Sequence, residues 1–298
     1  MIINVSGRTD IAAFYSKWFI NRIRDGYADV RNPFYPRQVS RIPLDSNHVD
    51  LIVFCTKNPI PLFPYLEELK DYSLLFQITL TPYTKETEPR VIGKGNMIKA
   101  FHFLASKYGK DRVMLRYDPI FINAKYTISY HEAMFRRLLE EIKDDISRVI
   151  ISFIDFKKNT RKHEQELGIK PLSQKEIETL AEVFSRVASS FAIPIQTCAE
   201  PYDLTQYGFR KGGCIDLETV YHLTGKTKGF RKNHNRSNCG CVQTVDLGVY
   251  NTCPHFCRYC YANYDEEQVI SNYYEHDPES SLLIGHLEED DKVTVRES

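Results

Sequence analysis

Residues 49–81 read VDLIVFCTKNPIPLFPYLEELKDYSLLFQITLT, and they contain the structural unit from which the rest of the fold can be inferred. The two apolar runs Val49–Thr56 and Leu74–Thr81 flank Ile60–Leu69, in which apolar residues recur at helical spacing. A strand, a helix and a second strand in this order indicate a β-α-β unit with parallel strands. Because both strands are apolar almost throughout, they are predicted to be buried on both faces of a sheet.

The same alternation extends over most of the chain. The other predicted strands are Ile2–Ser6, Val113–Tyr117, Val149–Phe153, Ile193–Cys198 and Thr244–Val249. The other predicted helices are Ile11–Arg24, Gly95–Tyr108, Tyr130–Asp144, Ser173–Ser190 and Leu217–Leu223. This pattern predicts an α/β fold, namely a partial or closed TIM-type barrel of parallel strands, with a doubly wound open sheet as the alternative.

Three regions are predicted along the 298 residues. Residues 1–207 form the α/β barrel core, residues 208–271 form a cysteine-rich segment that includes the last strand, and residues 272–298 form an acidic tail. The tail has little periodicity, so it is expected to lie on the surface or to be partly disordered. The polar segment Lys157–Lys170 is expected to be an exposed excursion from the core.

Composition narrows the class of protein. Lys and Arg together number 39, as do Asp and Glu, so the chain is formally neutral and nucleic-acid binding would need a local basic patch. No apolar run approaches the roughly 20 residues of a membrane span, and the first residues do not resemble a signal peptide. We therefore expect a cytoplasmic protein without a membrane partner. Thiols stay reduced in that compartment, where clustered cysteines bind metal more often than they form disulfides.

Three cysteines fall within the stretch Asn251-Thr-Cys253-Pro-His-Phe-Cys257-Arg-Tyr-Cys260. The spacing C-x3-C-x2-C puts three thiolates on one loop, which is enough to bind three irons of a four-iron cluster and to leave the fourth iron open. A structural zinc site needs a fourth ligand at similar range and a two-by-two spacing. The loop therefore predicts a [4Fe-4S] cluster, with structural zinc or unrelated thiols as the alternatives.

The remaining cysteines are of two kinds. Cys239 and Cys241 form a C-x-C pair, and Cys198 and Cys214 lie at predicted loop positions from which they can join it. Four thiolates would complete either a zinc site or a second [4Fe-4S] cluster, whereas Cys198 and Cys214 are otherwise small buried hydrophobic residues. Cys55 lies inside a strand and is expected to be inert. A less favoured interpretation makes Cys55 or Cys214 a hydrogen-atom donor to a radical.

Polar side chains follow the carboxyl ends of the predicted strands, where the functional groups of α/β barrels collect. Lys57 leaves a wholly apolar strand, and we expect it to bind an anion such as a carboxylate, because an unpaired lysine there would be costly. Arg116 and Asp118 form either a structural ion pair or part of a ligand site. Thr79 and Ser152 either cap their strands or line the same site.

A basic segment precedes the last predicted strand. It can contact nucleic acid or remain a solvated loop. Its members are Lys211, Lys226, Lys228, Arg231, Lys232 and Arg236.

The cysteine loop resembles that of radical S-adenosylmethionine (SAM) enzymes, which use C-x3-C-x-aromatic-C. The resemblance implies that Cys253, Cys257 and Cys260 bind a [4Fe-4S] cluster, that SAM chelates the open iron, and that Tyr259 packs near the adenine. Reductive cleavage of SAM would then give a 5′-deoxyadenosyl radical. The resemblance also implies an electron donor such as flavodoxin or ferredoxin.

A second resemblance covers more of the chain. The segments Phe54-Cys-Thr-Lys57-Asn, Gln77-Ile-Thr-Leu-Thr81, Glu88-Pro89 and Leu115-Arg116-Tyr-Asp118-Pro119-Ile look like the spore photoproduct lyase group. This implies that Lys57 binds the cofactor carboxylate and that the strand with Arg116 and Asp118 lies on the opposite wall of the cofactor site. Thr79 and Ser152 are assigned to the same site as polar residues at strand ends. The cysteine loop of that group follows the first strand, but here it follows the last. The likeness therefore implies a circular permutation in which Thr244–Val249 pairs with Ile2–Ser6.

The chain as a whole also looks like a bacterial and archaeal family of unknown function, and that likeness brings no activity with it. The function expected from the sequence is a radical SAM enzyme acting on nucleic acid, a peptide or a small metabolite, in which Tyr117 can relay a radical. The alternative is a non-catalytic iron–sulfur or zinc protein that acts as a redox sensor or scaffold. A zinc hydrolase built on His234 and His255 has weaker support.

Overall fold

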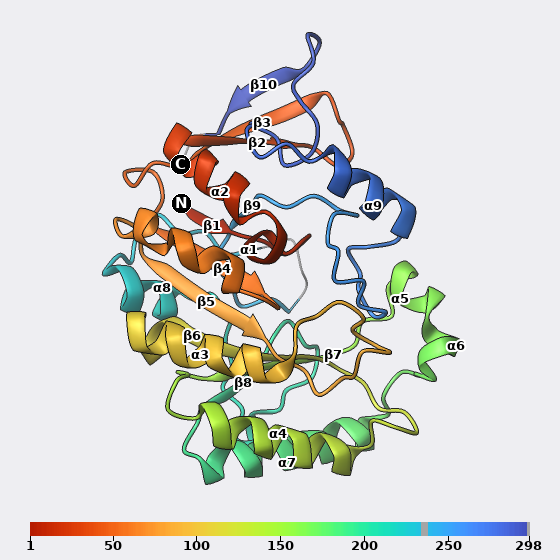
Figure 1. The fold of residues 1–298 in the computed structure, drawn as a ribbon. Helices are drawn as coiled ribbons and strands as arrows, with labels where there is room; N and C mark the ends of the chain where they lie inside the picture. The colour runs from red at the N-terminus through yellow and green to blue at the C-terminus, as the bar shows by residue number, and fades with distance from the viewer. Residues whose placement is uncertain (234–237, 297–298) are drawn as a thin grey trace. The chain divides into compact units, whose positions relative to one another are not determined.

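The computed structural model describes residues 1–233 and 238–296. Seven parallel strands form one sheet in the order β8-β7-β6-β5-β4-β1-β9 (Figure 1). Their bounds are β1 Ile2–Asn4, β4 Leu51–Thr56, β5 Leu74–Thr79, β6 Val113–Ile120, β7 Val149–Phe153, β8 Ile195–Thr197 and β9 Val245–Asp246. The predicted α/β class and parallel sheet are confirmed. Within the described ranges β8 and β9 are the edge strands, so the sheet is open rather than a closed barrel.

The last strand of the sheet lies beside the first. Ile3 is in register with Val245 and Asn4 with Asp246, and the two strands run parallel. This is the pairing expected from a permuted order of strands, and it is confirmed. Gly248 follows β9 at a point where no side chain fits, because a Cβ there would lie 1.9 Å from the Ser6 hydroxyl.

The predicted helices lie at the expected positions, but two of them differ in continuity or in helix type. Tyr15 divides the predicted helix Ile11–Arg24 into two. Ile60–Leu69 is a 3-10 helix, and Pro64 within it has no N–H to donate. A capping box between Ser173 and Glu176 begins the helix predicted over Ser173–Ser190. No helix in the described residues has both the length and the apolar character needed to cross a bilayer. The helices are α1 Ile11–Phe14, α2 Ser16–Asp25, η1 Ile60–Leu69, α3 Lys94–Tyr108, η2 Lys110–Arg112, α4 Ile128–Ile142, α5 Lys158–Lys162, α6 Glu164–Leu167, α7 Gln174–Ser190, η3 Thr205–Tyr207, α8 Leu217–Thr224 and α9 Glu266–Glu275.

The described chain divides into two compact units. The first comprises residues 1–75, 244–256 and 262–296 and contains β1, β4, β9 and the helices α1, α2, η1 and α9. Phe19 of α2 packs edge-on against Phe54 of β4, with ring centroids 5.7 Å apart. This contact places α2 on one face of β4, so Cys55, the next residue along the strand, is directed to the other face.

The acidic segment 272–298 contains regular structure that its composition did not predict. Its residues Lys292–Val295 form β10, which pairs parallel with β3 (Gln38–Pro43), and β3 in turn pairs antiparallel with β2 (Tyr27–Arg31). Figure 1 shows this three-stranded sheet, with β10 beside β3. The four residues of β10 are exposed, so hydrogen bonding to a distant strand, rather than burial, defines the element.

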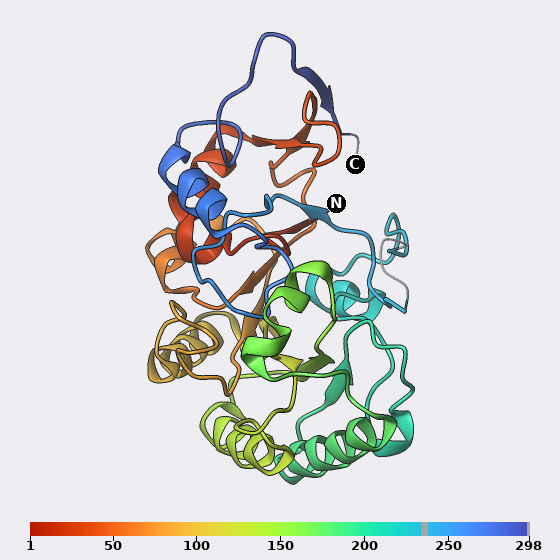
Figure 2. The ribbon, with the colours of Figure 1, turned by 90° about the vertical axis from the view of Figure 1, so that its right-hand side faces the viewer.

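The second unit comprises residues 76–243 and 257–261. Tyr117 of β6 packs against Phe135 of α4 and Phe184 of α7, and these two helices lie side by side (Figures 1 and 2). The segment Lys157–Lys170, expected to be an exposed excursion, forms α5 and α6. Its apolar residues Leu167 and Ile169 are buried in an aromatic cluster around Tyr83.

Candidate functional site

The cysteine loop begins in the first unit, where Asn251 holds the two ends of the loop together by hydrogen bonds. Asn251 has a positive φ of 55°, and its side-chain oxygen accepts hydrogen bonds from the backbone N–H groups of Tyr264 and Asp265 at 2.8 and 3.3 Å. The Asn251 N–H donates to the carbonyl of Ala262 at 3.0 Å. Residues before and after the cysteines are thereby held together, which closes the loop at its base.

A buried carboxylate joins this loop to two strand ends in the same unit. Asp10 follows β1 and is only 4% exposed. Its Oδ2 accepts a hydrogen bond from the backbone N–H of Lys57 at 2.7 Å and lies 2.9 Å from Nε2 of His255, within the cysteine loop. Its Oδ1 accepts from the N–H of Ala13 at the start of α1. The backbone of Lys57 is therefore fixed beside the loop that carries Cys253.

Buried polar atoms near this junction have no hydrogen-bond partner among the described residues. They are Nδ1 of His255, Oγ1 of Thr9 and Oδ1 of Asn263. His255 is 2% exposed, and its ring lies 4.6 Å from that of Phe14. The Asn263 amide also donates to the carbonyl of Cys253 at 2.6 Å. Unsatisfied polar atoms in a buried place are costly, so their position beside a cysteine loop fits a polar ligand.

A second buried carboxylate of this unit was not identified from the sequence. Asp246 accepts hydrogen bonds from the Ser6 hydroxyl at 2.7 Å and from the N–H groups of Gly7 and Gly248 at 2.8 and 2.7 Å. Burial raises the pKa of this carboxyl, and the hydrogen bonds act in the opposite direction. The only local signal was an aspartate in an apolar strand, because two of its three partners, Ser6 and Gly7, lie about 240 residues earlier in the chain.

In the second unit, Tyr259 is fixed by Glu88, which belongs to one of the segments quoted for the second resemblance. Its hydroxyl donates to Oε1 of Glu88, which also accepts from the Thr81 hydroxyl at 2.7 Å. The Tyr259 ring packs against Tyr83 and Phe121, and burial raises the pKa of its hydroxyl well above the usual range. This part of the cysteine loop is thus rigidly placed on an aromatic cluster.

The seven cysteines assigned to metal sites differ in exposure. Cys253, Cys257 and Cys260 are half-buried, whereas the other four are only 6–8% exposed. The first set is partly open to solvent. The buried set suits a closed site.

The four buried thiols meet in the second unit. The Cys214 and Cys241 sulfurs are 3.4 Å apart, the Cys198 thiol hydrogen-bonds that of Cys214, and the Cys239 thiol hydrogen-bonds that of Cys241. Hydrogen bonds from Cys198 and Cys241, and then the Arg116 guanidinium, hold the pKa of Cys214 well below its usual range. In the described part of the chain, no three His, Cys, Asp or Glu side chains already surround a common point as metal ligands would.

Arg116 and Asp118 form the ion pair that was one of their two predicted roles. Oδ1 of Asp118 lies 3.3 Å from Nε of Arg116, and a second guanidinium nitrogen donates to Oε1 of Gln77 at 3.0 Å. Ser152 donates to Asp118 at 3.3 Å, so its hydroxyl belongs to the same network. Thr79 is half-buried and lies opposite Arg116 in the register of β5 and β6.

Two of the residues considered for radical transfer, Tyr117 and Cys214, lie in the second unit and the third, Cys55, lies in the first. Tyr117 is 1% exposed, and its hydroxyl lies 3.0 Å from Nδ1 of His131 in the core beneath the helices. Since side chains alternate along a strand, Tyr117 is directed away from the face on which Arg116 reaches Cys214. Cys55 is half-buried in β4, in the first unit.

Each lysine and arginine of the basic segment that the structure describes is exposed. Lys211, Lys226, Lys228, Arg231 and Lys232 all face solvent, and Lys211 lies 3.8 Å from Asp203. Arg236, a member of the predicted patch, and His234, a weakly supported metal ligand, lie outside the described residues.

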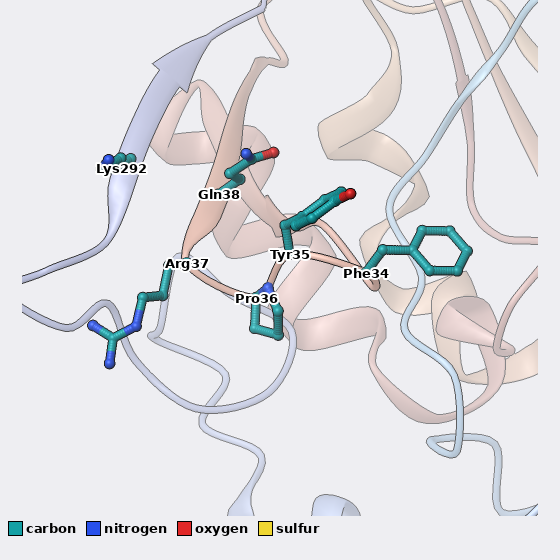
Figure 3. A pocket seen from close by; sticks show the side chains of 6 residues that line it. All are labelled: Phe34, Tyr35, Pro36, Arg37, Gln38 and Lys292. Atoms are coloured by element: carbon teal, nitrogen blue, oxygen red, sulfur yellow. The ribbon is translucent and has the colours of Figure 1, made fainter.

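Two hollows are found in the first unit. One, of about 260 Å³, is lined in part by Arg8, Gly248 and Tyr250, which lie at the ends of β1 and β9. The Arg8 guanidinium lies 5.4 Å from the centre of the Tyr250 ring. The other surrounds the exposed rings of Phe34 and Tyr35 (Figure 3) and contains none of the predicted site residues.

Comparison with known proteins gives one match. No curated protein and no solved structure matches the chain. A family model described as "Domain of unknown function (DUF1848)" matches residues 2–262. That match includes all seven strands of the parallel sheet and the three cysteines of the terminal loop. The chain belongs to the DUF1848 family.

Proposed function

We propose that this protein is a radical SAM enzyme, with a [4Fe-4S] cluster held by Cys253, Cys257 and Cys260. The observation that carries the proposal is the C-x3-C-x2-C loop itself, whose three thiols are half-buried and whose base is closed by Asn251. Three thiolates leave one iron free for a substrate or cofactor. We further infer that the open sheet is a permuted, partial TIM-type barrel, with β9 in the place of the first strand.

When bound, the cluster would supply one electron to the sulfonium of SAM, and the resulting 5′-deoxyadenosyl radical would take a hydrogen atom from the substrate. The unpartnered polar atoms of His255, Thr9 and Asn263 support the presence of a polar ligand beside the loop. His255 itself is held through Nε2 by Asp10, so its Nδ1 is kept in a fixed position.

Lys57 is proposed to bind the carboxylate of SAM. The backbone N–H of Lys57 donates to Oδ2 of Asp10, and the same oxygen contacts Nε2 of His255 in the cysteine loop. The Cα of Lys57 is therefore held beside that loop. An ammonium group at this place would offset the negative charge of the cofactor carboxylate and of the thiolates. Arg116 and Asp118 are assigned to the cofactor site by resemblance, and Thr79 and Ser152 by their places at strand ends.

Tyr259 is proposed to pack near the adenine and to hold the neighbouring Cys260. Its hydroxyl is bonded to Glu88 and its ring is fixed among aromatic side chains, so it acts by position rather than by titration. The enzyme is placed in the cytoplasm, with flavodoxin or ferredoxin as the electron donor. Nucleic acid is the substrate class that the exposed basic segment favours.

Anaerobic reconstitution with iron and sulfide tests the proposal. Wild-type protein should bind about four irons with an equal amount of labile sulfide at this loop. The electron paramagnetic resonance spectrum of the reduced cluster should change when SAM is added, and 5′-deoxyadenosine should form after reduction with dithionite. If the spectrum does not change and no 5′-deoxyadenosine forms, the proposal is wrong, and the protein is instead a non-catalytic iron–sulfur redox sensor or scaffold.

A further inference from the structure

Four buried cysteines converge in the second unit from three separate segments. Cys198 follows β8, Cys214 precedes α8, and Cys239 and Cys241 lie before β9. Their thiols are joined by successive contacts, from Cys198 to Cys214, from Cys214 to Cys241 and from Cys241 to Cys239. None of the four is a lone buried thiol, and the cluster is separate from the terminal cysteine loop in sequence.

Glycines make this convergence possible. A Cβ added at Gly213 would lie 2.4 Å from the backbone nitrogen of Cys241, and one added at Gly240 would lie 2.8 Å from the carbonyl carbon of Gly212. Two backbones therefore touch where any other residue would collide. The segments Gly212-Gly213-Cys214 and Cys239-Gly240-Cys241 are pressed together, and this contact brings the Cys214 and Cys241 sulfurs to 3.4 Å.

We propose that these four cysteines bind a single tetrahedral zinc ion. With zinc–sulfur bonds of about 2.3 Å, neighbouring sulfurs of a tetrahedral site are about 3.8 Å apart, close to the contact seen between Cys214 and Cys241. A four-iron cluster would hold its thiolates on four separate irons, and sulfurs in direct contact would have to move well apart. To bind one ion the four thiols must turn toward a common point, because no three of them surround one among the described residues.

Neighbouring groups fix the backbone of the cysteines and reach two of the sulfurs, since the side-chain amide of Asn233 lies 4.0 Å from the Cys239 sulfur. Gln77 donates from its side-chain amide to the carbonyl of Cys214 at 2.9 Å, and Asn233 donates from its backbone to the carbonyl of Cys241 at 2.9 Å. The Arg116 guanidinium hydrogen-bonds the Cys214 sulfur. Zinc with four thiolates carries a net negative charge, so a fixed guanidinium beside it is stabilising.

Metal analysis of full-length protein, purified without air, distinguishes this site from the cysteine loop. The triple variant Cys253→Ala, Cys257→Ala, Cys260→Ala should keep one equivalent of zinc per chain. The double variant Cys239→Ser, Cys241→Ser should lose that zinc, and Cys55→Ser, at a half-buried cysteine of β4, should keep it. Since the first variant lacks the proposed cluster ligands, this zinc does not depend on the radical SAM proposal.

A cobalt titration of the unmodified, metal-depleted chain avoids reliance on variants that fail to fold. Intense visible absorption of tetrahedral Co²⁺ and a thiolate-to-cobalt band at one equivalent, both reversed by Zn²⁺, are the expected result. The proposal is overturned by labile sulfide retained in the triple variant, which would indicate a second cluster. It is equally overturned if zinc content is unchanged in the double variant, or if Cys214 and Cys241 are found as a disulfide in place of bound metal.

Discussion

His255 Nε2 lies 2.9 Å from Oδ2 of Asp10, and this contact joins two residues 245 positions apart. Both side chains are buried, so the carboxylate and the imidazole are held without competition from bulk water. Because the same oxygen accepts the Lys57 N–H, one atom sets the positions of the first strand end, the β4 end and the cysteine loop in the first unit.

Asp10→Ala should destabilise the fold by about 2–4 kcal/mol. The Lys57 N–H and the His255 ring would lose their acceptor, and each unsatisfied buried group costs about 1–3 kcal/mol. Urea unfolding of the metal-free protein measures the change. Asp71→Ala, at an exposed position of the same unit, should stay within about 0.5 kcal/mol of wild type. Equal effects of the two variants would contradict the role assigned to Asp10.

Cys257→Ala should abolish iron binding at the terminal loop and the formation of 5′-deoxyadenosine, because two thiolates do not hold a four-iron cluster with one open iron. The side chain is only half-buried, so the circular dichroism spectrum should be unchanged. Iron and sulfide analysis after anaerobic reconstitution is the measurement. If cofactor cleavage persisted in this variant, the ligand assignment would be wrong.

Lys57→Ala should weaken SAM binding by about 1–3 kcal/mol, the usual loss for a charged hydrogen bond, or roughly 5- to 150-fold in Kd. Equilibrium dialysis with the reconstituted protein provides the Kd. Lys17→Ala removes a lysine that is 63% exposed in the same unit and should leave the Kd unchanged. A Kd unaffected by the Lys57 change would assign this lysine a structural role.

His131 should make the protein less stable in mild acid. It is fully buried between Tyr117 and the Phe121 carbonyl, and burial lowers its pKa from 6.5 to about 4. The unfolded chain then binds the proton more readily, so stability is complete above pH 6.5 and is lost as the pH falls toward 4. The loss amounts to about 3 kcal/mol.

Chemical unfolding at several pH values tests this dependence. The His131→Gln variant should show a flatter curve between pH 4 and 6.5, although it will be less stable overall. A curve as steep as that of wild type would mean that other groups govern the acid sensitivity.

The exposed basic segment should contribute to nucleic-acid binding. Changing Lys226, Lys228, Arg231 and Lys232 to Glu should reduce affinity for single-stranded DNA by at least about tenfold and flatten its dependence on salt. Fluorescence anisotropy at several salt concentrations is the measurement. In the control variant, four other exposed lysines of the second unit are changed to Glu, which gives the same change of net charge. These lysines are Lys99, Lys110, Lys143 and Lys175. Equal losses in both variants would show a net-charge effect and no dedicated surface.

Local patterns in the sequence predicted the parallel strands and most helices, because a run of apolar residues or a capping box depends on neighbours in the chain. The spacing of Cys253, Cys257 and Cys260 was visible for the same reason. The pairing of Thr244–Val249 with the first strand followed from comparing the order of motifs. The 3-10 form of Ile60–Leu69 was not predicted, because apolar residues at helical spacing do not distinguish it from an α-helix.

Contacts between distant segments were decided by the tertiary structure. In the sequence Asp246 is only one polar residue in an apolar strand. The structure shows that it accepts hydrogen bonds from Ser6 and Gly7. Exposed Lys292–Val295 has no burial pattern and becomes a strand only through hydrogen bonds to β3. The four buried thiols meet because glycines let two backbones touch. Such contacts depend on how distant segments pack against one another. A single stretch of sequence does not show which distant residues it will contact.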